Sequence, residues 1–164
     1  MKFNIPVLIT SCWTTFAVLQ GTASAQDDAG PFDIATMEIA RTITAHGAEM
    51  LGAGDVEGIV DQYMETGELV STTTHPNSQP TTTIIRGTEN LRKFFKVAEN
   101  LGRTAPTNVV NNARLVAPNT IYIVGTLELT GEDGRIARIP FSQVRTLIGT
   151  TWKIVSLQVI FQGT

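Results

Sequence analysis

The sequence contains a single cysteine, Cys12, among 164 residues, and charged side chains make up only 16% of it. One cysteine excludes a disulfide framework within the chain and a zinc site built from cysteines. The two histidines, His46 and His75, have no metal-ligand spacing, so we expect neither a metal nor another cofactor. A net charge of −3 gives no general attraction for nucleic acid, and a hydrophobic content of 42% argues against intrinsic disorder.

The N-terminal segment has the order of a secretory signal peptide. Lys2 is followed by an uncharged run from Phe3 to Leu19, and the small residues Ala23-Ser24-Ala25 precede Gln26-Asp27-Asp28. This order predicts a signal peptide over residues 1–25 that is cleaved after Ala25. Its removal from the 164 residues leaves 139, without cysteine. We therefore expect an exported protein, periplasmic or secreted, with no stable membrane anchor after cleavage.

Two alternatives stay open for this segment. A membrane anchor needs about 20 predominantly apolar residues, whereas the uncharged run has 17 and includes Asn4 and Pro6. Alternatively, Ile9-Thr10-Ser11-Cys12 resembles a bacterial lipobox, in which Cys12 would carry a lipid. The residues after Cys12 stay apolar, unlike the polar tether that normally follows a lipidated cysteine.

After a short flexible lead at 26–32, residues 33–164 are predicted to form one domain, which begins with helices. A helix is expected from Asp33, and its buried stripe is predicted to contain Ile39, Ile43, His46 or Gly47, and Met50. Asp55 is placed to cap a second helix from Val56 to about Met64. A third helix begins near Thr88, and one face of it holds Leu91, Phe94, Phe95 and Ala98.

The rest of the domain is predicted to be mostly strand. β-Branched runs between turn signals predict strands at 68–73, 81–85, 109–116, 120–130, 135–147 and 151–161. An Asp-Gly pair in Gly131–Gly134 indicates a hairpin turn. This order of elements predicts an α+β fold, in which the helices gather on one face of a curved antiparallel sheet.

Three phrases resemble the nuclear transport factor 2-like superfamily, which includes SnoaL-like and ketosteroid-isomerase-like domains. They are Ala53-Gly54-Asp55 to Tyr63, Ile85-Arg86-Gly87 to Leu91, and Trp152-Lys153-Ile154-Val155, and the resemblance spans residues 33–161. It implies a cone, in which the curved sheet wraps around three N-terminal helices and encloses a pocket. It also implies a homodimer through the convex sheet face. Because members include isomerases, cyclases, hydratases, transport factors and binding domains, the fold alone leaves the function open.

The resemblance places the catalytic carboxylate of ketosteroid-isomerase-like enzymes at about Ser71, which is too weak a base to replace it. Weak candidates for a base are His46 and Glu68, with Asn112 or Gln158 to hold an oxyanion. The predicted pocket residues are Tyr63, Ser71, Phe94, Phe95, Asn112, Tyr122, Arg145, Trp152 and Gln158. Strict alternation places Trp152, Ile154, Ser156, Gln158 and Ile160 on one face of the last strand. It likewise groups Phe141, Gln143, Arg145 and Leu147 on one face of the neighbouring strand.

Arg145 has two interpretations at this point: it could hold a ligand carboxylate, or pair across strands with Glu128. The leading functional hypothesis is a non-catalytic domain that binds a small, largely apolar molecule in its pocket. The alternatives are a SnoaL-like isomerase, cyclase or hydrolase that uses His46 or Glu68, and a structural dimerisation or interaction module.

Overall fold

The computed structural model describes residues 31–98, 106–131 and 134–162. The predicted signal peptide, with Cys12 and the cleavage site after Ala25, lies outside the described residues, as do most of the predicted lead and the middle of the predicted hairpin turn. Among the helices of the described part, none is both long enough and apolar enough to span a membrane.

The three predicted helices are present, with different bounds. They are α1 (Pro31–Ala53), α2 (Val56–Asp61) and α3 (Thr88–Ala98), so α1 already begins inside the predicted lead. Asp55 caps α2 as predicted, and its carboxylate accepts a hydrogen bond from the Gly58 N–H at 2.9 Å. α2 is shorter than predicted because Gln62 forms its C-cap and the next residue already begins the first strand.

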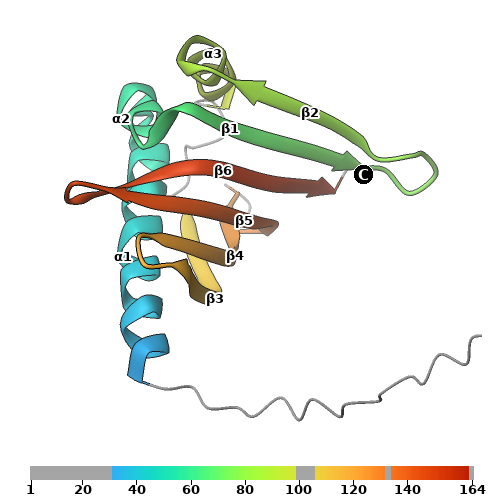
Figure 1. Cartoon of the computed structure of the whole chain (residues 1–164). Coiled ribbons are helices and arrows are strands. Elements are labelled where there is room, and N and C mark those ends of the chain that lie inside the picture. The colour runs from blue at the N-terminus through green and yellow to red at the C-terminus, as the bar shows by residue number, and fades with distance from the viewer. Residues whose placement is uncertain (1–30, 99–105, 132–133, 163–164) are drawn as a thin grey trace, which may run out of the picture.

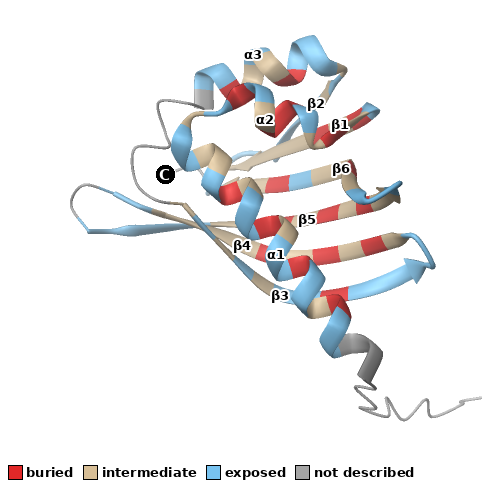
Figure 2. Cartoon of the chain, turned by 90° about the vertical axis from the view of Figure 1, so that its left-hand side faces the viewer, coloured by how far each residue is buried: buried red, intermediate tan, exposed pale blue. Residues whose placement is uncertain are grey.

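Six strands form one sheet in the order β2-β1-β6-β5-β4-β3 (Figure 1). Their bounds are β1 (Tyr63–Thr74), β2 (Thr81–Arg86), β3 (Thr107–Ala117), β4 (Thr120–Thr130), β5 (Ile136–Ile148) and β6 (Thr151–Gln162). β6 pairs in parallel with β1, and all other neighbours pair antiparallel. The helices lie on one side of this curved sheet, which confirms the predicted α+β fold (Figure 2).

The predicted stripe of α1 is only partly right: Ile43 and Met50 pack against the core and Gly47 is half-buried, but the stripe misses the most buried positions. Ile39 is 38% exposed and His46 is also exposed, whereas the most buried positions are Thr36, Ala40, Thr44 and Ala48. Small side chains allow the helix backbone to approach β3, where the Asn108 amide donates to the Thr44 carbonyl at 2.7 Å. The buried Thr44 hydroxyl donates to the Ala40 carbonyl at 2.8 Å, so close packing leaves it satisfied.

Several register shifts interrupt the sheet, and two of them change the faces of predicted site residues. These two are β-bulges, at which the pairing of β3 skips Asn111 and the pairing of β6 with β5 skips Val155. An extra residue reverses the alternation of inner and outer side chains beyond it. On β6, Ile154 and Val159 are buried, while Gln158 is exposed. The predicted strict alternation along the last strand is therefore wrong from Val155 onward.

Candidate functional site

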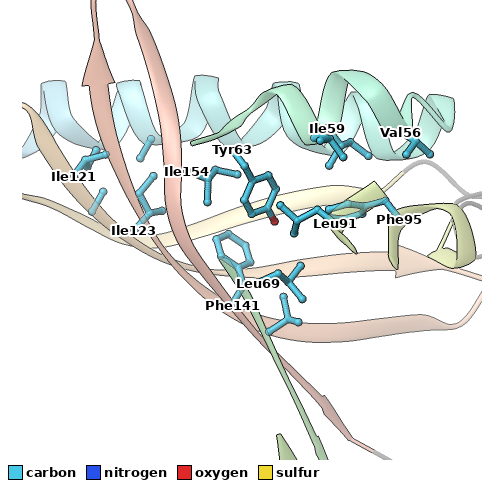
Figure 3. Close-up of a cluster of buried hydrophobic side chains, with 14 residues drawn as sticks. Val56, Ile59, Tyr63, Leu69, Leu91, Phe95, Ile121, Ile123, Phe141 and Ile154 are labelled. Carbon is cyan, nitrogen blue, oxygen red and sulfur yellow. The ribbon is translucent and has the colours of Figure 1, made fainter. Parts of the chain in front are cut away.

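A cavity of about 150 Å³ lies between the helices and the inner face of the sheet. Its wall is mainly apolar and includes Leu51 and Phe94 from the helices and Leu127, Phe141 and Leu157 from the strands. The surrounding core, with Phe95, Leu91 and Ile154, is drawn in Figure 3. An apolar chamber with few polar groups is the usual form of a site for a small molecule.

The polar part of the cavity wall is centred on Arg145, from β5. Its Nε donates to Oε1 of Gln143 at 2.5 Å, and its Nη1 donates to Oε1 of Gln62 at 3.1 Å. Gln62 is held in turn by its own amide, which donates to the Met50 sulfur at 3.2 Å. These contacts come from three separate parts of the fold, so the guanidinium is fixed in position.

Burial shifts the pKa values of two side chains in this wall, Arg145 and Tyr63. Arg145 is only 3% exposed, and burial lowers its pKa to about 10, so it stays protonated at neutral pH. Burial raises the pKa of Tyr63 well above its usual range, although the charge of Arg145 opposes this shift. The Tyr63 hydroxyl has no hydrogen-bond partner among the described residues, and Figure 3 shows it pointing into the core towards Leu91 and Leu69.

Four of the predicted pocket residues line the cavity together: Tyr63, Phe94, Phe95 and Arg145. The two phenylalanine rings meet edge to face, with their centroids 5.3 Å apart. The alternative pairing of Arg145 with Glu128 is not formed, because Glu128 accepts a hydrogen bond from Arg138 at 2.9 Å. Arg145 instead faces the cavity.

The other predicted pocket residues do not line the cavity. Ser71 and Trp152 are half-buried; Ser71 pairs with the inner-facing Val159, and Trp152 packs against the core beside the cavity. Asn112, Tyr122 and Gln158 lie on the opposite face of the sheet. The bulge at Asn111 turns Asn112 outward, and the bulge at Val155 turns Gln158 outward. Tyr122 lies beneath Arg114, with 5.5 Å between its ring centroid and the guanidinium carbon.

The two weak candidates for a catalytic base also lie away from the cavity. The His46 side chain is 61% exposed and lies 3.6 Å from Glu49, and Glu68 forms an ion pair with Arg86 at 2.8 Å. The described lining residues include no carboxylate and no histidine. In the described part of the chain, no cluster of potential metal ligands is present either. The described part of this wall supplies apolar contacts and polar groups that can hold and orient a ligand.

Sequence reasoning missed Gln62 and Asn108 as lining residues. Gln62 follows α2 directly, and the prediction of a longer helix placed it in a helical turn instead. Asn108 lies before the bulge on β3, whereas the predicted Asn112 lies beyond it. Gln143, two residues before Arg145, was correctly placed on the same strand face.

Solved structures with the same architecture are numerous, although no protein-family profile and no curated protein matches the sequence. A domain of unknown function with a cystatin-like fold from Nostoc punctiforme has a TM-score of 0.62 and 17% identity, over 79% of each chain. A nuclear transport factor 2-like protein of unknown function from Shewanella oneidensis has a TM-score of 0.58 and 14% identity, over 77% of this chain and 98% of that one. Aln2 from a Streptomyces species also has a TM-score of 0.58, with 11% identity over 80% of this chain and 92% of its own. The chain therefore has the nuclear transport factor 2-like fold, as its sequence resemblance implied.

Proposed function

We propose that the protein binds a small, largely apolar molecule in this cavity and does not transform it chemically. The observation that carries the proposal is the composition of the wall: apolar side chains surround one fixed polar cluster, and the described lining residues provide no general base. Such a wall excludes water from the body of a ligand while the polar groups set its orientation.

Thermal unfolding with a panel of apolar molecules of benzene size and somewhat larger tests this function. A ligand at 100 times its Kd is expected to stabilise the fold by about 2.7 kcal/mol. Leu157→Trp fills the cavity and should abolish this stabilisation. Ile148→Trp adds the same ring at a position that is 53% exposed and should leave it intact. If no member of the panel raises the melting temperature, and mass spectrometry of the natively purified protein finds no retained ligand, the proposal is wrong.

We also propose that the chain is exported and cleaved after Ala25, on the strength of the Ala23-Ser24-Ala25 sequence and the uncharged run before it. Expression with its native N-terminus in a bacterial host should yield a protein of 139 residues in the periplasm or medium. Intact-mass measurement identifies that product. An Ala23→Leu, Ala25→Leu double variant should keep its leader, because the small residues needed at the cleavage site are lost. A product that instead begins at a lipid-modified Cys12 would contradict the proposal.

We further propose a homodimer through the sheet face that the described helices leave uncovered. This outer face carries Val124, Val144 and Ile160, with Ile84 and Val109 at 51% and 43% exposure. A second copy would bury these side chains in a symmetric contact of the kind that most soluble dimers form.

A further inference from the structure

We infer that the ligand of the cavity is a carboxylic acid in its anionic form, with the carboxylate on Arg145 and an apolar body in the rest of the chamber. This inference rests on the proposed function, because it requires that the cavity holds a ligand. It goes further by assigning the chemical class of the ligand and the residue that selects it.

The guanidinium of Arg145 is a buried charge without a counterion among the described residues. Both of its hydrogen-bond partners, Gln143 and Gln62, are neutral amides. Three arginines nearer the surface differ, since Arg86, Arg92 and Arg138 each form an ion pair with a glutamate. A buried cation is unfavourable unless an anion compensates it. Among these four arginines, Arg145 is the least exposed and is the one without a carboxylate partner in the described residues.

The free donors of this guanidinium suit a carboxylate. Arginine has five N–H groups, and the bonds to Gln143 and Gln62 use one on Nε and one on Nη1. The remaining donors on Nη1 and Nη2 can bind a planar oxyanion with two parallel bonds. A Cβ at position 47 would lie 3.9 Å from Nη2, so Gly47 leaves room beside the guanidinium.

The charge and the volume of the site narrow the chemical class of the ligand further. Arg145 is the one charged group among the described lining residues, so it matches a single negative charge rather than the double charge of a phosphate monoester. A cavity of about 150 Å³ accommodates a molecule of roughly benzene size. The apolar wall, with Phe94 and Leu157, then surrounds a short hydrocarbon chain or one ring.

Calorimetric titration with isosteric pairs tests this inference on the purified protein. The probes are benzoate with benzamide, and hexanoate with hexanamide, which differ mainly in charge. Whichever acid binds more tightly is expected to bind about 30-fold more tightly than its amide. The reason is that a hydrogen bond to a charged group contributes more binding free energy than one between neutral groups. In Arg145→Met this preference should disappear, while the affinity for the amide changes by less than about threefold. Arg138→Met removes an exposed arginine from the same strand and should retain the full preference.

The outcomes separate this inference from the proposed function. Equal affinities for acid and amide would overturn the carboxylate inference and leave the binding function standing. A preference for the acid that survives in Arg145→Met would also overturn it. If neither acids nor amides bind, the carboxylate inference is wrong, and the thermal-unfolding panel and the search for a retained ligand decide the binding function separately. The comparison of acid with amide on the wild-type protein stays decisive even if Arg145→Met does not fold.

Discussion

Replacing Gly125 by alanine is expected to lower the free energy of unfolding by about 3 kcal/mol and the melting temperature by roughly 10 °C. Gly125 is buried in β4, where a Cβ would lie 2.5 Å from the Val109 carbonyl oxygen and 2.6 Å from Cζ of Phe141. The carbonyl belongs to the paired backbone of β3, so the strand must shift to relieve the contact. Urea unfolding followed by Trp152 fluorescence measures the loss.

Gly47→Ala provides the matched control, because the same methyl group enters a helix without a close contact. Its Cβ would lie 3.5 Å from Oε1 of Gln62, which is an ordinary van der Waals distance. Alanine also favours the helical backbone by about 1 kcal/mol over glycine. The two variants should therefore change stability in opposite directions, and a Gly125→Ala protein as stable as the wild type would contradict the packing described for β4.

Val124→Lys is expected to convert the proposed homodimer into a monomer. Val124 lies on the outer face of β4 between Asn112 and Ser142, near the middle of the uncovered surface. A symmetric contact would bring two copies of the new lysine together in an apolar interface, where neither charge has a partner. Sedimentation equilibrium measures the change as a halving of the mass in solution.

Val97→Lys serves as the control for this prediction, because Val97 is 76% exposed on α3, on the helical side of the sheet. It introduces the same charge without touching the outer face, so the protein should keep the dimer mass. A wild-type protein that sediments as a monomer at micromolar concentration would contradict the proposed homodimer.

The sequence predicted the fold well because most elements carry local signals. Asp55 before Val56 marked the start of α2, and the long runs of β-branched residues gave β4, β5 and β6 to within a residue or so. α1 was harder, because its most buried positions are alanines and threonines, with large apolar side chains only partly buried beside them. Close packing against β3 selects small residues there, and hydropathy alone does not register that requirement.

The candidate site was predicted only in part, for a related reason. Arg145 and Phe94 were found because their elements have regular periodicity. Asn112 and Gln158 were wrong because each follows a β-bulge, and one extra residue moves every later side chain to the opposite face. The skipped residues, Asn111 and Val155, carry no glycine or other local signal of a bulge.

The central place of the last strand has a consequence for how the chain is made. β6 (Thr151–Gln162) lies between β1 and β5. The pair β1 and β2 therefore has no backbone pairing with β3, β4 and β5 until β6 is inserted between them. The ribosome must therefore complete all five other strands, and β6 itself, before the native sheet can close. For a protein that is proposed to leave the cytoplasm, this order of synthesis keeps the nascent chain open for threading through a translocation channel. The same order makes loss of β6 more damaging than loss of an edge strand.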